Sequence, residues 1–413
     1  MKTYPTIQSL WHGARTLVVI VVVMLLAACS KEDEPEIQQF SRSVLVYLSA
    51  QNTMAGNVDN DVIEMLSAVS AMDKNDRLVL FLDDNNRSRF YEITKDTTAR
   101  YLNNLTPVYQ YDNNLNSAAP QDFEKVLSYF FQNYKAETYG LVMWSHGSGW
   151  INARSINSSA PRRSFAVDTN QGTTTRMNIT DMGDVMRKYP KFEYILFDAC
   201  FMQTIEVVYE LRETAKYIIG SPAEIPGRGA PYNLLLPVLF RKVSADNMAQ
   251  GIVNTYGNYY NVPGNSSGVV LSAIKTDEFD GFVDKTAVLF DKYSFMDPTN
   301  TKYTDCQNYY FYSWNQTANV AFIAPDEYDI KGIMQRNVTN SVDYEKWEAA
   351  FDKLVPYKNI GPSWYSAYVR AYIPVDQNQC GAVSMFVPLE RYKNDYYYDF
   401  YKELQWGKLY DIK

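Results

Sequence analysis

The residues with the clearest chemical potential are a histidine and a cysteine, each placed after a short apolar run. His146 follows the run 139–144, and Cys200 follows the run 194–197. The chain has two histidines, and the other one, His12, lies near the N-terminus. A thiol is activated as a nucleophile when a neighbouring base removes its proton. Any such chemistry based on Cys200 and an imidazole must therefore use His146.

The elements that position this pair follow from hydrophobic patterning. The two apolar runs are rich in β-branched and aromatic residues, which predicts buried strands. Strands and helices alternate along the chain, which predicts an α/β fold with a mainly parallel sheet covered on both faces. We expect strands at 44–48, 78–82, 89–93, 139–144, 194–198, 217–220 and 269–271, and helices at 58–72, 123–134, 179–189, 204–214, 234–240, 245–259 and 276–293.

The carboxyl ends of parallel strands lie at one edge of a sheet, where α/β folds keep their active sites. His146 and Cys200 are therefore expected to meet there. A helix expected just after Cys200 would lower the pKa of the thiol through its positive end. From about residue 295 the chain is rich in Tyr and Asn. That part is expected to hold short strands, including 382–388, and a final helix near 397–404.

The N-terminus has the layout of a leader. A weakly basic start precedes an apolar core at 17–26, which has the length of a signal-peptide core. The sequence Leu-Ala-Ala-Cys at 26–29 resembles a bacterial lipobox, which implies cleavage after residue 28 and acylation of Cys29. The alternative is an ordinary secretory signal with an incidental cysteine. The lipobox reading implies a Gram-negative outer membrane lipoprotein, on the cell surface or the periplasmic face.

The expected organisation has four parts. They are a signal peptide at 1–28, a lipidated flexible tether at 29–42, an α/β core at 43–294, and a C-terminal α+β subdomain at 295–413 that packs on or completes the core. The acidic stretch at 30–34 resembles tags that route lipoproteins to the cell surface, although a plain disordered tether is the alternative.

Charge and cysteine content narrow the partners. The formal net charge is −8, and removing the leader with Lys2 and Arg15 gives 37 − 47 = −10. No basic tract is present, which argues against nucleic-acid binding and against an electrostatic membrane surface, so the N-terminal lipid is the expected membrane contact. A monomer is expected. Cys306 and Cys380 either form a disulfide or remain two buried thiols.

Cofactor chemistry is not indicated. No phosphate-binding loop motif occurs, and no close Cys/His spacing predicts a zinc site. We therefore expect no metal and no cofactor, while a requirement for calcium stays open.

The motifs around the two strands resemble those of a known family. They are Trp-Ser-His-Gly-Ser-Gly-Trp at 144–150, Asp-Ala-Cys-Phe-Met at 198–202 with its following helix, Ile-Pro-Gly-Arg-Gly at 225–229, and the segments 386–388 and 405–407. Together they resemble the clostripain-like cysteine peptidases of the caspase-like clan. The resemblance spans nearly the whole chain after the leader and is strongest over 139–232. It implies a caspase-like α/β/α sandwich and hydrolysis of protein or peptide substrates by Cys200 and His146.

The resemblance also implies roles for neighbouring residues. The backbone N–H groups of Gly147 and Cys200 would bind the substrate oxyanion. Asp198 would line the primary specificity pocket and favour cleavage after basic residues, whereas a strand-end or capping role is the alternative.

Two features concern specificity and maturation. Arg228 stands where the family commonly has an acid. It would therefore repel basic substrate side chains and neutralise Asp198, and Glu224 would compensate its charge. The alternative is that Arg228 points to solvent. The Ser- and Pro-rich loop that holds Arg154, Arg162 and Arg163 resembles the processing region of the family. An ordinary solvated loop is the alternative.

Three functions remain open from the sequence. The first is a cysteine endopeptidase that cuts at or near basic residues with an altered pocket charge. The second is a transpeptidase on the same fold. The third is a catalytically silent caspase-like module that binds peptides or host proteins through its Tyr-rich surface.

Overall fold

The computed structural model describes residues 39–151, 165–170, 173–265, 268–295, 301–303, 305–309, 313–315, 320–322, 327–367, 370–388 and 396–409. The chain divides into a unit Met1–Gln39 and a unit Phe40–Lys413. The expected signal peptide, Cys29 and the three arginines of the expected processing loop lie outside the described residues. Within the described ranges, no helix has both the length and the apolar character required to cross a membrane.

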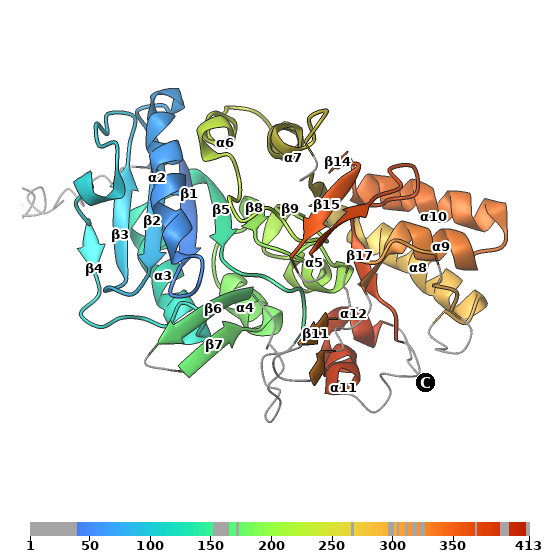
Figure 1. The fold of residues 1–413 in the computed structure, drawn as a ribbon. Helices are drawn as coiled ribbons and strands as arrows, with labels where there is room; N and C mark the ends of the chain where they lie inside the picture. The colour runs from blue at the N-terminus through green and yellow to red at the C-terminus, as the bar shows by residue number, and fades with distance from the viewer. Residues whose placement is uncertain are drawn as a thin grey trace, which may run out of the picture. The chain divides into compact units, whose positions relative to one another are not determined.

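A nine-stranded sheet forms the centre of the second unit (Figure 1). Its five middle strands, β9, β8, β5, β1 and β2, pair in parallel, and the strands at both edges pair antiparallel. In order across the sheet the strands are β14 (Tyr357–Ile360), β10 (Val270–Lys275), β9 (Ala215–Gly220), β8 (Phe192–Asp198), β5 (Ala136–Trp144), β1 (Phe40–Ser49), β2 (Asp76–Asp83), β3 (Arg89–Ile93) and β4 (Tyr109–Gln110).

Helices cover both faces of this sheet because successive strand residues point to opposite sides. In β1, for example, Leu45 and Tyr47 belong to one buried cluster, whereas Val44 and Val46 belong to the other. One face packs on α2 (Val58–Ser67), α6 (Tyr232–Leu239) and α7 (Ala245–Tyr260), and the other packs on α3 (Pro120–Asn133), α4 (Ile179–Met186), α5 (Ile205–Leu211) and α8 (Phe279–Lys292). The expected α/β/α sandwich with a mainly parallel sheet is confirmed.

The C-terminal part of the chain contributes to the same unit. It supplies β14 to the edge of the central sheet and adds β17 against β13. It contains α9 (Ile330–Asn337), α10 (Ser341–Leu354), α11 (Tyr396–Glu403), α12 (Gln405–Lys408), and the short strand pairs β11 (Ser313–Asn315) with β12 (Val320–Phe322), β13 (Glu327–Asp329) with β17 (Ser384–Phe386), and β15 (Ser363–Ser366) with β16 (Ala371–Pro374). Helices α9 and α10 were not among the elements expected from the sequence.

A small hairpin lies beside the carboxyl edge of the sheet. Strands β6 (Phe165–Asn170) and β7 (Thr173–Met177) pair with each other, with an irregularity between Phe165 and Val167. This hairpin contacts β1 and holds the segment that follows β5, so it takes part in positioning His146.

Candidate active site

The register of two neighbouring parallel strands brings His146 and Cys200 to the same level of the sheet. Trp144, the last residue of β5, lies opposite Asp198, the last residue of β8. His146 and Cys200 each lie two residues beyond that pair. Their loops are in direct contact, since a Cβ atom added to Gly147 would lie 2.5 Å from the carbonyl oxygen of Cys200. Glycine at this position is therefore a packing requirement of the two loops.

His146 is held from both its ring and its backbone. Its Nε2 atom lies 2.8 Å from Thr53 Oγ1, in the turn that follows β1. Its carbonyl oxygen accepts a hydrogen bond from the Ala166 N–H of β6 at 3.1 Å. Burial lowers the pKa of His146, and the positive charge of Arg176 lowers it further. The imidazole is therefore neutral at neutral pH and can accept a proton.

Cys200 carries a protonated thiol in this arrangement. The Ile225 N–H donates to its Sγ atom at an N-to-S distance of 3.4 Å. Burial raises the pKa of the Cys200 thiol to about 12, and the charges of Glu224 and Asp198 act in the same direction. The expectation of a lowered thiol pKa is wrong, because burial dominates the pKa of Cys200. Helix α5 begins only at Ile205, five residues further along the chain.

Asp198 is a fully buried carboxylate at the end of β8. Its Oδ2 atom accepts hydrogen bonds from the Ala230 N–H at 3.0 Å and from the Tyr232 hydroxyl at 2.8 Å. Its Oδ1 atom accepts from the Tyr256 hydroxyl at 2.9 Å. Burial raises the pKa of Asp198, and these three donors oppose that rise. The carboxylate thus holds the backbone of the Gly-Arg-Gly loop against the sheet.

Arg228 points away from this carboxylate. Its guanidinium pairs with Glu64 of α2 at 2.6 Å, and 62% of its side chain is exposed. It also lies 5.7 Å from the ring centre of Tyr259. The partner of Arg228 is therefore Glu64 rather than Asp198, which differs from the neutralisation expected from the sequence.

Glu224 connects the cysteine loop to the C-terminal part of the chain. It is buried, and its Oε1 atom accepts a hydrogen bond from the Ala367 N–H at 2.9 Å. Ala367 follows β15, so Glu224 anchors the β15–β16 hairpin beside Ile225 and Cys200. The sequence suggested that Glu224 would compensate the charge of Arg228. The contact found for Glu224 is the backbone of Ala367, whereas Arg228 pairs with Glu64.

The two other cysteines that the structure describes, Cys306 and Cys380, are free thiols. Cys306 is half-buried, and Cys380 is buried beside the Tyr309 hydroxyl at 3.0 Å. The sequence left open whether Cys306 and Cys380 form a disulfide, and in the structure they are two unpaired thiols. In the ranges that the structure covers, no group of three or more His, Cys, Asp or Glu side chains is arranged to hold a metal ion.

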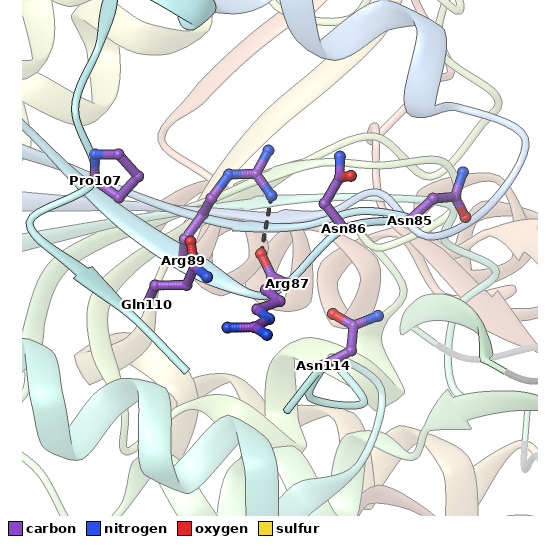
Figure 2. Close-up of a pocket in the computed structure, with 7 residues that line it drawn as sticks. All are labelled: Asn85, Asn86, Arg87, Arg89, Pro107, Gln110 and Asn114. Atoms are coloured by element: carbon purple, nitrogen blue, oxygen red, sulfur yellow. Dashed lines mark hydrogen bonds between the residues drawn. The ribbon is translucent and has the colours of Figure 1, made fainter. Parts of the chain in front are cut away.

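A separate polar hollow lies over the turn between β2 and β3 (Figure 2). Its volume is about 540 Å³. The Arg89 guanidinium donates to the Arg87 carbonyl oxygen at 2.9 Å and pairs with Asp84. Asn114, also in its wall, donates to Gln51 at 2.7 Å, close to the turn that carries Thr53.

Several contacts of the site were not predicted from the sequence. Thr53, Ile225 and the tyrosines 232 and 256 all contact a predicted site residue. Ile225 belongs to the motif at 225–229 and Tyr232 follows it, but the sequence assigned neither a contact. Thr53 has no local pattern that marks it, since its role depends on the β1–β5 pairing, and Tyr256 is hidden among the 34 tyrosines of the chain.

A thiol and a neutral imidazole at the carboxyl edge of a mainly parallel sheet are the features of a cysteine peptidase of caspase-like fold. Residues 46–412 match the clostripain family. Clostripain of Hathewaya histolytica is 25% identical over 220 residues, which span 46% of this chain and 40% of clostripain. The matched region is thus less than half of the length of that relative.

Two solved structures resemble the whole fold. One is a secreted C11 cysteine protease from Bacteroides thetaiotaomicron in complex with an irreversible peptide inhibitor, with 28% identity, a TM-score of 0.74, and coverage of 90% of this chain and 99% of that chain. The other is an inactive zymogen C11 protease from Parabacteroides distasonis, with 26% identity, a TM-score of 0.72, and coverage of 90% and 98%. The chain belongs to the clostripain family, and its class is that of the cysteine peptidases, which are hydrolases.

Proposed function

We propose that this protein is a cysteine endopeptidase that hydrolyses peptide bonds through Cys200 and His146. The observation that carries the proposal is the alignment of the two residues beyond the paired positions Trp144 and Asp198, with Gly147 packed against the Cys200 backbone. This alignment supports a nucleophile and a base that serve one reacting carbonyl group.

The proposed chemistry begins from a neutral pair. With Nε2–H donating to Thr53, the Nδ1 lone pair of His146 is the base that takes the thiol proton as Cys200 attacks the scissile carbonyl carbon. The backbone N–H groups of Gly147 and Cys200 stabilise the oxyanion. The imidazolium then gives its proton to the leaving amine, and water hydrolyses the acyl-enzyme.

The proposed substrates are proteins or peptides cut at or near basic residues. The position of Asp198 behind the Gly-Arg-Gly loop, where it accepts a hydrogen bond from the Ala230 N–H, supports a preference for a cationic side chain. Arg228 is paired with Glu64, which reduces its repulsion of such a substrate.

The test is cleavage of a peptide library by the purified protein. Cys200→Ala and His146→Ala are each expected to abolish cleavage, whereas Cys306→Ala serves as the control for loss of a half-buried free thiol and should cut at the wild-type rate. Near-normal turnover by either active-site variant, with an unchanged thermal unfolding temperature, would reject the dyad.

A silent peptide-binding module is the second candidate. It is favoured by the protonated resting thiol of Cys200 and by the bond between His146 and Thr53. Iodoacetamide labelling separates the two functions. In a peptidase without bound inhibitor, iodoacetamide should alkylate Cys200 faster than Cys306. A silent module should alkylate both thiols at the same rate and should cleave no peptide.

We further propose that the chain is exported by its leader and acylated at Cys29, which would make it a Gram-negative outer membrane lipoprotein. The support is the lipobox-like sequence at 26–29, and the Bacteroides relative is described as secreted. Mass spectrometry of protein from membranes should find a lipid-modified Cys29 at the N-terminus. An unmodified Cys29 or an intact leader would contradict this proposal.

A further inference from the structure

Two buried carboxyl groups lie side by side behind the turn that contacts His146. Asp83 is the last residue of β2, Asp168 lies in β6, and both are fully buried. The Ser117 N–H donates to Asp168 Oδ2 at 2.7 Å and lies 3.2 Å from Asp83 Oδ2. A single N–H group thus faces an oxygen atom of each acid. Neither acid forms an ion pair with a described lysine, arginine or histidine.

The hydrogen bonds around the pair are complete except at one atom. The Ser88 hydroxyl donates to Asp83 at 2.7 Å, and the Ser117 hydroxyl donates to Asp168 Oδ2 at 3.1 Å. Asp168 Oδ1 accepts no hydrogen bond from any residue that the structure describes. A proton carried by Asp83 supplies the missing donor, because two adjacent buried carboxylates cannot both be ionised without a large energetic cost.

The charge balance agrees with this geometry. Burial and the neighbouring Asp168 together raise the pKa of Asp83 to about 8. The other ionisable groups nearby do not replace the proton. Asp122 at the start of α3 and the Tyr47 hydroxyl of β1 are acidic groups, and Arg89 is paired with Asp84. Arg176 lies on β7 opposite Val167.

Strand β6 connects the pair to both supports of His146. The Ala166 N–H donates to the His146 carbonyl oxygen. The Asn52 side chain donates to the Val167 carbonyl oxygen at 2.7 Å, and the Thr169 N–H donates to the Gln51 carbonyl oxygen at 2.9 Å. Residues 51 and 52 directly precede Thr53, the contact of the imidazole ring. Displacement of β6 therefore acts on the His146 backbone and on its ring together.

We propose that Asp83 and Asp168 share one proton and that this protonated pair is a positioning device for His146, acting through β6 and the 51–53 turn. Loss of the proton places two charges in contact in a buried site and drives β6 away from the end of β2. Both supports of His146 then loosen, and peptidase activity falls on the alkaline side. The effect of the pair on the position of His146 does not depend on the proposed peptidase function, whereas its effect on turnover rests on that function.

The chain offers a direct probe, since its two histidines are His12 and His146. Selective ¹⁵N-histidine labelling of the full chain gives imidazole signals from these two residues, which the His12→Gln variant distinguishes. In the wild type, the His146 signals should change a second time near pH 8, separately from the titration of the ring itself. This readout does not require catalytic activity, so it remains valid if the peptidase proposal fails.

Asp83→Asn tests the origin of that change, because its amide N–H₂ supplies a permanent donor to Asp168. The second change in the His146 signals should disappear, and the alkaline fall in kcat/KM should move to higher pH with kcat at pH 7 within about twofold of the wild type. Asp168→Asn should behave in the same way, and it serves as the test if Asp83→Asn does not fold. Asp84→Asn, one residue further along and paired with Arg89 instead, is the matched control and should keep the wild-type profile.

Three results would overturn the inference. The first is a wild-type His146 signal that shows no second change between pH 7 and pH 9. The second is a change that persists in both amide variants. The third is a rise in the thermal unfolding temperature on adding Ca²⁺ that Asp83→Asn abolishes, since the two acids would then hold a cation in place of a proton.

Discussion

Thr53 is the contact that completes the candidate catalytic pair at the scale of single residues. Its hydroxyl lies 2.8 Å from His146 Nε2 and can fix the ring orientation and tautomer. A serine keeps this hydroxyl, whereas a valine keeps the shape and loses it. The pair Thr53→Ser and Thr53→Val therefore separates hydrogen bonding from packing.

We expect Thr53→Val to lower kcat by about tenfold, equivalent to about 1.4 kcal/mol, with little change in KM. Thr53→Ser should recover most of the activity. Steady-state kinetics on a peptide substrate measures both effects. Equal activity of the valine variant and the wild type would show that the ring needs no partner at Nε2.

Arg228 and Asp198 differ in what their substitution removes. Arg228 is mostly exposed and its ion pair with Glu64 is of a kind that contributes about 0–1 kcal/mol. We expect Arg228→Ala to change kcat/KM for Arg or Lys substrates by less than about threefold. Comparison of Arg, Lys and Leu substrates measures this. A tenfold gain for basic substrates alone would mean that Arg228 reaches the specificity pocket during binding.

Asp198→Asn is the corresponding change at a buried site. The amide group would face three donors that now bind a carboxylate, which leaves donors unpaired and costs about 1–3 kcal/mol of stability. A loss of activity in this variant must therefore be read together with its unfolding free energy.

At the scale of elements, the contact between two loops sets the distance between Cys200 and His146. Gly147 touches the backbone of Cys200, and an alanine Cβ would lie 2.5 Å from its carbonyl oxygen and 2.9 Å from Ala199 Cβ. Neither neighbour is the free end of a flexible side chain. Substitution must therefore move one loop away from the other.

We expect Gly147→Ala to reduce kcat/KM by about 100-fold, because misplacement of reacting groups by about 1 Å has effects of that size. Gly227→Ala is the matched control, since nothing lies within 4 Å of its Cβ position. Peptide cleavage by both variants, with circular dichroism to verify folding, measures the difference. Similar activity of the two variants would contradict a role for this contact.

At the scale of the whole molecule, buried acids connect the catalytic loops to the C-terminal part of the chain. The Trp150 Nε1–H donates to Glu327 of β13 at 2.6 Å, and the Phe386 N–H of β17 donates to Glu206 of α5 at 2.9 Å. Burial and the charge of Glu206 raise the pKa of Glu327 well above its ordinary value. The segment that follows His146 is therefore hydrogen-bonded to β13, and the helix that follows Cys200 is hydrogen-bonded to β17. These two strands pair with each other.

These acids determine how stability changes with pH. Burial raises the pKa of Asp61 and of Asp83 to about 8 each, and that of Glu206 to about 7. In the unfolded chain the same groups release their protons near pH 4. Folded protein therefore holds more protons than unfolded protein between about pH 4 and pH 8, and stability falls as the pH rises through that range.

We expect the thermal unfolding temperature to decline from pH 6 to pH 8 and to level off above that range. Asp61→Asn should make the decline shallower, because it removes one group whose proton is released on unfolding. Differential scanning calorimetry over a pH series measures this. A stability that rises steadily from pH 6 to pH 9 would contradict the assignment of these buried acids as protonated.

The sequence by itself determined the class of the fold and indicated the two candidate catalytic residues. Continuous apolar runs predict parallel strands because both of their faces are buried, and His146 is one of only two histidines, the other being His12 near the N-terminus. These features are local, so they can be read without knowing which strands are neighbours. The helices α9 and α10 were missed although Trp347, Phe351 and Leu354 of α10 follow a helical spacing, because the region from residue 295 to the final helix was interpreted as short strands.

Tertiary structure decided everything that depends on pairing between distant segments. The β5–β8 register aligned His146 with Cys200, the turn after β1 brought Thr53 to the imidazole, and Glu64 of α2 took Arg228 away from Asp198. Helix proximity in the sequence suggested an acidic thiol, but burial beside Glu224 and Asp198 gave the opposite pKa direction. Burial and charge are sums over neighbours in space, and many of those neighbours are distant in the sequence, as Glu224 is from Cys200 and Thr53 is from His146.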